Sequence, residues 1–415
     1  MKFRLFLFAV FAVTFFFISC QSGRDQANGG KSPAEVSEEK IDSLINLMTI
    51  DEKIKLIHAS SSFTSGGVPR LGIPELVFSD GPHGVRHEHG RGWFALEGAD
   101  DEATYLPVGI CLASTWSKDL GYEYGVVLGN EAKERGKHVL LGPGINIIRS
   151  PLNGRNFEYL SEDPFLTAIM GTGYVQGLQD QGVAACPKHF AANNQETDRH
   201  NIDVIISKRA LNEIYFPAFR AVVQDGGAWS IMGAYNKING QHTTHHEYLN
   251  NIMLKGEWGF DGVVISDWGS VNDTREALLY GTDIEMGTEL LRDLFNPVYE
   301  EFYLARPAKE LIESGEIDES YLDDKVRRIL RLMYRTTALT DHGPGKRNVE
   351  EHQRIALEVA REGMVLLKND GLLPLNKKEI KTIAVIGHNA TRHFAERGGS
   401  SQVRSLYEIT PLEGI

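Results

Sequence analysis

Cysteine and basic charge are scarce in this 415-residue sequence. Its three cysteines stand at positions 20, 111 and 186. Cys111 and Cys186 lie in apolar segments, so we expect buried free thiols and not a disulfide-stabilised domain. Lys and Arg number 43 against 56 Asp and Glu, a net charge of −13, and no basic block occurs, so nucleic acid is not an expected partner. No Gly-x-Gly-x-x-Gly follows a first strand, so we expect no dinucleotide and no other cofactor.

Long apolar runs are also missing after the N-terminus. Residues 5–18 form an apolar run that follows basic residues and ends beside Cys20. The run is shorter than the ~20 residues of a membrane-spanning helix, and it is typical of an export signal. Its end resembles a bacterial lipobox, which implies a signal peptide over residues 1–20, lipidation of Cys20 and a tether over residues 21–37. We therefore expect a lipid-anchored protein of the bacterial cell envelope, periplasmic or outer-membrane, with an ordinary secretory signal as the alternative.

Between residues 38 and 335, short apolar runs alternate with helical patterns. This rhythm predicts an α/β fold, a (β/α)8 TIM-type barrel, with a doubly wound sheet as the alternative. Strands are expected at residues 76–79, 139–141, 184–186, 230–234, 263–266 and 284–286. Helices are expected at residues 37–49, 51–58, 163–179 and 207–224.

One of these strands, residues 263–266, runs directly into Asp267 and Trp268. Barrel enzymes keep catalytic groups at the carboxyl ends of their strands, where a side chain can face a cleft. An Asp in this position could instead cap a helix that starts near Val271. The two interpretations are about equal for this strand alone, so the other strand ends decide between them.

Charged, amide or aromatic residues follow several of the other expected strands too. Because parallel strands end at one mouth of a barrel, these side chains are predicted to surround one cavity. Their donors and rings suit a polyhydroxylated ligand, whose hydroxyls need polar partners and whose apolar face stacks on an aromatic ring. The clusters are Asp80 with His83 and Arg86, Arg149 with Arg155, Lys188 with His189, Tyr235 with Asn236, and Asp267 with Trp268.

Four blocks of sequence resemble the signature segments of glycoside hydrolase family 3, in its β-glucosidase branch. They are residues 79–86 (SDGPHGVR), 154–164 (GRNFEYLSEDP), 188–197 (KHFAANNQET) and 264–268 (VISDW). Their order and spacing also fit, and the likeness extends from about residue 41 to the last residue. The resemblance implies an exo-acting retaining hydrolase that removes β-D-glucose from the non-reducing end of a β-glucoside or β-linked oligosaccharide.

The resemblance also implies a role for individual residues. Asp267 would be the nucleophile that forms a covalent glycosyl-enzyme, and cations beside it would keep it ionised. Eight further residues would bind or flank the terminal sugar: Asp80, Arg86, Arg155, Lys188, His189, Arg199, Tyr235 and Trp268.

A retaining glycosidase also needs a proton donor, and in the β-glucosidase branch a Glu of a following α/β sandwich domain supplies it. Here residues 336–351 are an expected linker, and residues 352–415 hold only the beginning of such a domain. Within it we expect a helix at 352–368 and a buried strand at 383–387. We therefore expect an incomplete sandwich domain and a chain that stops before its acid/base Glu.

Other interpretations remain open at this point. Asp198 and His200 have the spacing of the acid/base pair in the N-acetylglucosaminidase branch, although Ala191 to Asn194 depart from the Pro-Gly-His-Gly of that branch. A β-xylosidase or arabinofuranosidase would share the same blocks. A non-catalytic sugar-binding lipoprotein is the alternative outside enzymes, although a binder has no use for a nucleophile.

Two further groups of polar residues, one acidic and one of histidines, are not expected to take part in catalysis or metal binding. Glu158, Glu162 and Asp163 precede an expected helix, where acidic residues favour the N-terminal dipole. The histidines lack the accompanying Cys or carboxylate spacing of a zinc site, so we expect no metal. These histidines are His87, His89, His242, His245 and His246.

Overall fold

The computed structural model describes residues 37–92, 94–287, 298–395 and 399–415. The expected signal peptide, Cys20 and most of the tether lie outside these ranges. Within them, no helix combines the length and the apolar character needed to cross a bilayer. Cys111 and Cys186 are free thiols as predicted, Cys186 buried and Cys111 partly exposed.

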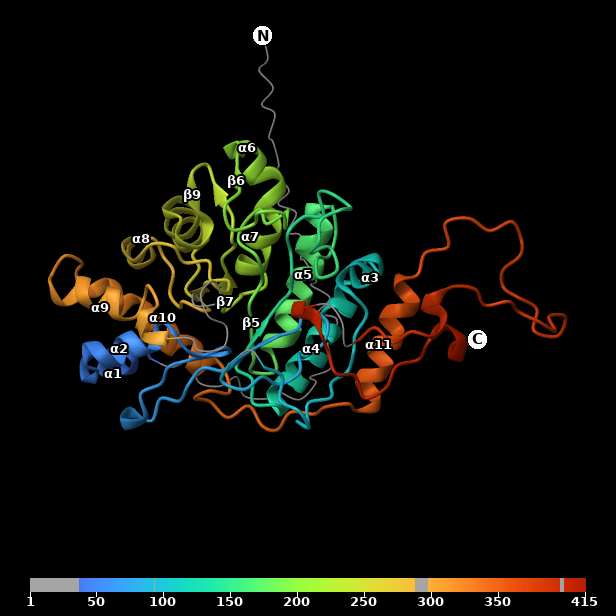
Figure 1. Ribbon diagram of the computed structural model, residues 1–415, viewed down its shortest axis with the longest axis horizontal. Coiled ribbons are helices and arrows are strands. Elements are labelled where there is room, and N and C mark those ends of the chain that lie inside the picture. The colour runs from blue at the N-terminus through green and yellow to red at the C-terminus, as the bar shows by residue number, and fades with distance from the viewer. Residues whose placement is uncertain (1–36, 93, 288–297, 396–398) are drawn as a thin grey trace, which may run out of the picture. The chain divides into compact units, whose positions relative to one another are not determined.

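Short parallel strands form the centre of the fold (Figure 1). β3 (Phe78–Asp80), β4 (Val139–Leu141) and β5 (Ala184–Ala185) make one parallel sheet, and β7 (Ser230–Met232) pairs in parallel with β10 (Val263–Ile265). All of their residues are buried. This explains why β4, β5 and β10 are apolar throughout, because a strand covered on both faces has no polar side.

The sheets are joined by isolated bridges, such as the parallel bridges between Ile265 and Ile284 and between His58 and Glu285. Next to them, β1 (Ala59–Ser61) and β2 (Thr64–Ser65) pair antiparallel. The predicted α/β class is confirmed, but a closed barrel of eight parallel strands is not found in the described part of the chain. The ladders are two or three residues long, and an antiparallel hairpin occurs where a (β/α)8 barrel has only parallel pairs.

Three helices cover one side of these strands. α4 (Lys118–Glu134) packs against α5 (Pro164–Gln179), and α5 packs against α7 (Pro217–Gln224). The two longer helices approach closely because glycines lie between them. A Cβ on Gly177 would lie 1.9 Å from the carbonyl oxygen of Tyr122.

The helix starts follow local capping chemistry. Thr49 and Glu52 form a capping box at α2 (Ile50–Leu56), after α1 (Glu38–Leu47), and Asp163 caps α5 as expected. The helix expected at 207–224 is interrupted between α6 (Lys208–Ala210) and α7, since Pro217 lacks the N–H that a continuous helix needs.

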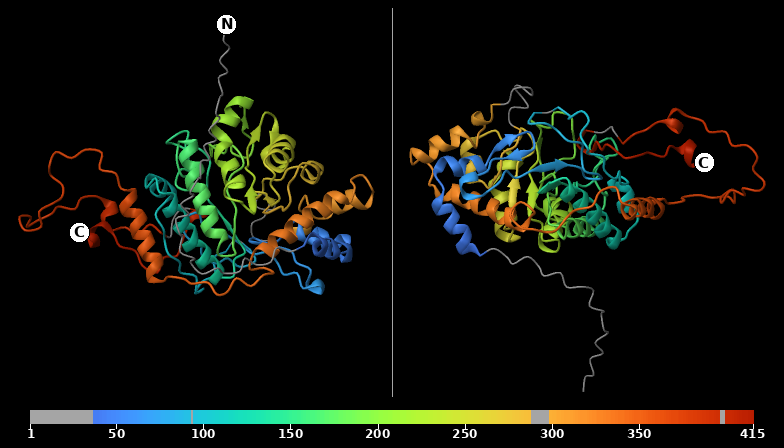
Figure 2. Two further views of the ribbon diagram at one scale, coloured as in Figure 1. Left: turned by 180° about the vertical axis from the view of Figure 1, so that it is seen from behind. Right: turned by 90° about the horizontal axis from the view of Figure 1, so that it is seen from below.

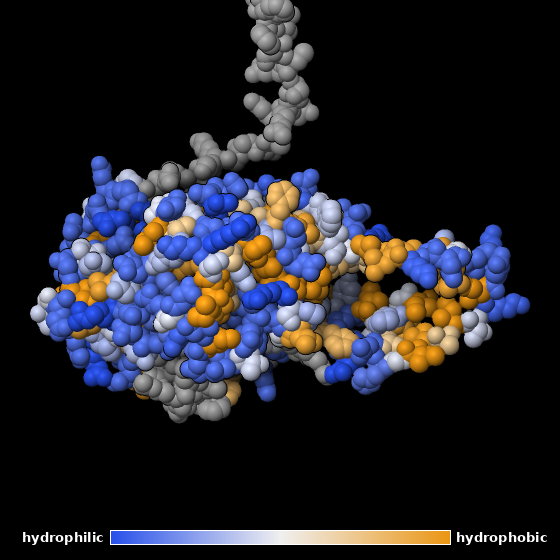
Figure 3. Space-filling view, turned by 90° about the horizontal axis from the view of Figure 1, so that it is seen from above, coloured by the Kyte–Doolittle hydropathy of each residue, from blue (hydrophilic) through white to orange (hydrophobic). Residues whose placement is uncertain are grey.

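The C-terminal part differs most from the prediction. α11 (Glu350–Gly363) packs on α3 (Gly109–Ser114) and α4, but the helix ends five residues before the expected residue 368. The strand expected at 383–387 is absent, and Ile386 is 90% exposed. A strand needs a paired neighbour for its backbone groups, and the described residues after 363 run mostly as coil (Figure 2). Figure 3 shows apolar side chains on the surface of this segment, at the right.

Residues 399–405 of this segment nevertheless contact the strand-bearing region. Val403 is fully buried, and it packs so closely on Gly84 that a Cβ on Gly84 would lie 2.5 Å from the Val403 side chain. Arg404 Nη1 donates to Asp101 Oδ1 over 2.7 Å, and a parallel bridge joins Ala103 to Ser405. These contacts bring the neighbouring Ser400 to the carboxyl ends of the strands.

Candidate active site

Asp267 stands two residues after β10, at the carboxyl end of that strand. It is 6% exposed, and its Oδ1 accepts a hydrogen bond from the Trp268 N–H over 2.8 Å. Its Oδ2 is buried and has no hydrogen-bond partner among the described residues. The capping interpretation is wrong, because α8 (Thr274–Leu279) begins later and Asp273 caps it. The Tyr235 side chain also lies close enough to the carboxyl group of Asp267 to lower its pKa, and His189 Nε2 lies 3.5 Å from Oδ2.

Of the side chains predicted to surround one cavity, those of Arg149 and Asn236 line a different cavity, and His83 lines neither of the two. The structure brings together the nine residues to which the resemblance gives a role. They line a single cavity of about 450 Å³, within the range of roughly 300–1,000 Å³ typical of small-molecule sites. The lining residues are Asp80, Arg86, Arg155, Phe157, Lys188, His189, Met232, Arg199, Tyr235, Asp267, Trp268, Gly399 and Ser400. These nine residues thus surround one cavity, and the role of each remains a prediction.

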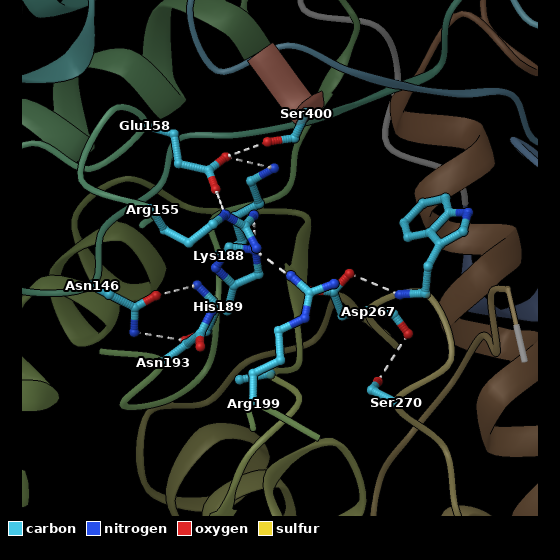
Figure 4. Close-up of polar contacts among 12 residues, drawn as sticks. Asn146, Arg155, Glu158, Lys188, His189, Asn193, Arg199, Asp267, Ser270 and Ser400 are labelled. Atoms are coloured by element: carbon cyan, nitrogen blue, oxygen red, sulfur yellow. Dashed lines mark hydrogen bonds and ion pairs between the residues drawn. The ribbon is translucent and has the colours of Figure 1, made fainter. Parts of the chain in front are cut away.

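A buried carboxylate, Glu158, connects the cations of this cavity (Figure 4). It pairs with Arg155 Nε and with Lys188 Nζ, the latter at 3.2 Å, and Ser400 Oγ donates to it over 3.0 Å. Burial alone would raise the pKa of Glu158, but Arg155 and Lys188 hold it well below its usual range. The helix-dipole interpretation of Glu158 is wrong, since α5 begins six residues later and Asp163 caps it.

His189 is held in one neutral form by its partners. Arg155 Nη2 lies 2.9 Å from His189 Nε2 and can only donate, so Nε2 carries no proton. Nδ1 lies 3.1 Å from the Tyr159 hydroxyl, which itself donates to the Asn193 carbonyl. Nδ1 therefore carries the proton, and burial together with Arg155 lowers the pKa of His189. The 3.5 Å separation of His189 Nε2 from Asp267 Oδ2 is consequently not an ion pair.

The charge on Asp267 depends on two opposing effects. Burial raises the pKa of its carboxyl group, whereas Arg155, Lys188 and the hydrogen bond from Trp268 lower it. The cations expected from the sequence are present, but the pKa of Asp267 is raised and not lowered, because the effect of burial exceeds theirs. Arg155 and Lys188 thus favour the ionised form of Asp267 against the effect of burial.

Asp80 ends β3 on the other side of the cavity. Its Oδ2 accepts from Arg86 Nη1 over 3.0 Å, and its Oδ1 accepts from Lys188 Nζ over 3.4 Å. Lys188 therefore bridges Asp80 and Glu158, and burial of the lysine is compensated by two carboxylates. This arrangement orients the Asp80 carboxylate as a hydrogen-bond acceptor at the cavity wall.

Aromatic rings form the walls of the cavity near Arg199 and Asp267. Trp268 Nε1 donates to the Ser62 carbonyl over 2.8 Å, which fixes the indole. The guanidinium of Arg199 lies 4.1 Å from the centre of the Tyr235 ring. Trp268 belongs to the apolar core, as the packing interpretation predicts, and it also lines the cavity, where a binding role stays a prediction.

Two family profiles match this sequence. The profile of the Glycosyl hydrolase family 3 N terminal domain matches residues 32–332, and that of the Glycosyl hydrolase family 3 C-terminal domain matches residues 364–415. The chain belongs to glycosyl hydrolase family 3. The resemblance inferred from the four blocks is confirmed.

Several relatives of this chain are named for their activities. The chain is 47% identical to Beta-glucosidase BoGH3A of Bacteroides ovatus, over 98% of this chain and 56% of that protein. It is 38% identical to an exo-alpha-(1->6)-L-arabinopyranosidase of Bifidobacterium longum, over 86% of this chain and 46% of that protein. The structure of beta-glucosidase 3B from Thermotoga neapolitana with alpha-D-glucose matches with a TM-score of 0.82 and 36% identity, covering 90% of this chain and 53% of that one. The chain thus spans about half the length of these relatives.

Some residues of this family 3 cavity were not expected from the sequence. Phe157, Met232, Gly399 and Ser400 also line it. Glu158 could have been found from the sequence, since it lies in the same block as Arg155. Nothing in the sequence indicated Ser400, because 242 residues separate it from its partner Glu158.

The residues of the N-acetylglucosaminidase alternative do not line the cavity. Asp198 is exposed, and its Oδ1 accepts from Asn201 Nδ2 over 2.8 Å. The ring of His200 contacts the Tyr235 ring edge-on at 4.4 Å. The histidines considered for a metal form no group of three potential ligands within the described ranges.

Proposed function

We propose that this chain carries the sugar-binding and nucleophilic part of an exo-acting retaining β-glucosidase. The observation that supports this most is the place of Asp267 in a cavity lined by Arg155, Lys188 and His189, where its Oδ2 has no hydrogen-bond partner among the described residues. A carboxylate held in that setting suits attack on an anomeric carbon. The names of the relatives favour β-linked glucose as the terminal sugar, although one relative is an arabinopyranosidase.

In the proposed reaction, a terminal sugar occupies the cavity with its hydroxyls on Asp80, Lys188 and Arg155. Asp267 forms a bond to the anomeric carbon while the bond from that carbon to the leaving oxygen breaks, and the electron pair departs with the oxygen. Water then displaces Asp267, which releases the sugar with its configuration retained. Trp268 supports the apolar face of the ring.

The proton donor is the missing component of this reaction. Among the described residues that line the cavity, Asp80 and Asp267 are the carboxyl groups, and Asp80 is occupied by Arg86 and Lys188. A retaining enzyme needs a donor about 5 Å from its nucleophile. We therefore propose that the acid/base group comes from outside these residues, from the remainder of a family 3 C-terminal domain.

Leaving-group chemistry tests both parts of this proposal. Nitrophenyl β-glucoside needs a proton donor for fast cleavage, whereas dinitrophenyl β-glucoside departs with little assistance. We expect the chain without residues 1–20 to turn over the dinitrophenyl substrate at least ~100-fold faster than the nitrophenyl one, because acid catalysis contributes about 10²–10⁴-fold. Equal turnover of both substrates would place the acid within these residues, and no turnover of either would contradict the nucleophile.

The same assay identifies the terminal sugar. The β-xyloside, β-N-acetylglucosaminide and α-L-arabinopyranoside with the dinitrophenyl group provide matched comparisons, since only the sugar differs. We expect the glucoside to have the highest kcat/KM. A preference for the N-acetylglucosaminide would favour Asp198 and His200 as the acid/base pair.

We also propose that Cys20 carries a lipid and anchors the protein in the cell envelope. The support is the apolar run at residues 5–18 that ends beside this cysteine. Cys20→Ala should move the protein from the membrane fraction into the soluble fraction of a bacterial expression host, and Cys111→Ala is the matched control. Continued membrane attachment of the Cys20→Ala protein would overturn this proposal.

A further inference from the structure

A second cavity lies beside the catalytic cavity and is of nearly the same size, about 440 Å³. The walls of both cavities come from the same segments of chain. Tyr235 lines the catalytic cavity and the next residue, Asn236, lines the second one. The loop that carries Arg199 into the catalytic cavity likewise places Asn194 and Ile202 in the second.

The second cavity contains polar atoms that the fold leaves without partners. Asn236 is 1% exposed, and its Nδ2 donates to the carbonyl oxygens of Ala191 and Lys237. Its Oδ1 is buried and has no partner in the described chain, and the same holds for Asn194 Oδ1. Both residues line the second cavity, and a buried amide oxygen without a partner is costly unless a hydrogen-bond donor reaches it.

A cationic donor completes the polar lining. Arg149 is exposed and forms no hydrogen bond or ion pair with any residue of the described ranges. It lies in the cavity wall with Ser150, and Asp203 is the acidic residue of the same wall. The cavity therefore offers one strong donor and several acceptors.

The donor and acceptor groups of the second cavity indicate which class of ligand it can bind. An anion would pair with Arg149 but would face the oxygens of Asn194, Asn236 and Asp203, and a cation would be repelled by Arg149. A hydroxyl group both donates and accepts, so a polyol satisfies all of these groups. Ile202 and Ile205, the latter 79% exposed, provide aliphatic contacts for the C–H groups of a sugar.

We propose that this second cavity binds a neutral saccharide, separately from the catalytic cavity. Arg149 donates to a ring hydroxyl, and Asn194 and Asn236 accept from others. The proposal does not require turnover, and it stands apart from the proposed glucosidase activity.

Ligand-observed saturation-transfer NMR on the chain without residues 1–20 tests this proposal. The probe is thiocellobiose, whose sulfur linkage resists hydrolysis, and saturating deoxynojirimycin serves as a competitor for the catalytic cavity. We expect part of the thiocellobiose signal to disappear with the competitor and part to persist. Arg149→Ala should weaken the persistent binding about tenfold, because a hydrogen bond to a charged donor is lost, and Arg149→Lys should restore part of it.

Arg220→Ala removes an exposed arginine from a different surface and is the matched control. A thiocellobiose signal that the competitor abolishes completely would overturn the second site, and so would persistent binding that Arg149→Ala leaves unchanged. If the competitor removes no part of the thiocellobiose signal and Arg149→Ala weakens all of it, the result would instead contradict the proposed sugar site at Asp267. The two proposals can therefore fail independently.

Discussion

Asp267→Ala should reduce the turnover of dinitrophenyl β-glucoside by at least ~10⁴-fold, as the loss of other enzyme nucleophiles does. The reason is that Oδ2 of Asp267 is the oxygen that attacks the anomeric carbon. The variant should fold normally, because Oδ1 accepts a single hydrogen bond, from Trp268, and Oδ2 accepts none from the described residues. Steady-state kinetics and thermal unfolding measure the two effects.

Azide provides the control that separates a nucleophile from a structural residue. In the Asp267→Ala cavity this small anion can attack the anomeric carbon directly, which releases dinitrophenolate and forms an α-glucosyl azide. Asp80→Ala removes the other carboxylate of the same cavity, and azide should not restore its activity. Loss of stability in Asp267→Ala, or equal azide effects on both variants, would contradict the assignment.

Glu158→Gln should lower the free energy of unfolding by about 3 kcal/mol, the usual cost of removing one partner from a buried ion pair. Glu158 is 1% exposed and neutralises both Arg155 and Lys188, which remain buried in the variant. Sugar binding should weaken as well, because both cations line the cavity. Urea denaturation gives the stability, and Glu162→Gln, at an exposed position of the same segment, should change it by less than ~0.5 kcal/mol.

The stability difference between Glu158→Gln and the unaltered chain should also depend on pH. The pKa of Glu158 is lowered in the folded state, whereas an unfolded Glu titrates near ~4.3. The contribution of the carboxylate is therefore complete above about pH 5 and decreases as the pH falls below the unfolded value toward the folded one. A difference that stays constant down to pH 3 would show that charge is not the cause.

The strands and the cavity residues were predictable because their signals are local. Buried runs such as residues 139–141 and 263–265 are apolar throughout, and each strand end carries its polar group within a few residues. The same pattern located Asp80, Lys188 and Asp267 at one cavity. The pairing of the strands could not be predicted from the sequence. An apolar run does not indicate whether its neighbouring strand is parallel, as in the pair of β7 and β10, or antiparallel, as in the pair of β1 and β2.

The failed predictions depend on contacts between distant segments. Residues 383–387 read as a strand from composition, but a strand forms only beside another strand. Glu158 read as a helix-terminal acid, because its partners Lys188 and Ser400 lie far along the chain. The raised pKa of Asp267 likewise follows from burial, which the sequence around it does not reveal.

Trapping the glycosyl-enzyme tests the central claim most directly. A dinitrophenyl glucoside with fluorine in place of the hydroxyl beside the anomeric carbon forms the covalent intermediate without a proton donor and hydrolyses slowly. Mass spectrometry of the proteolysed chain should locate one fluoroglucosyl group on Asp267, within the peptide that contains residues 263–268. A label on Asp80, Glu196 or any other carboxylate, or release of dinitrophenolate without a label on Asp267, would contradict the account.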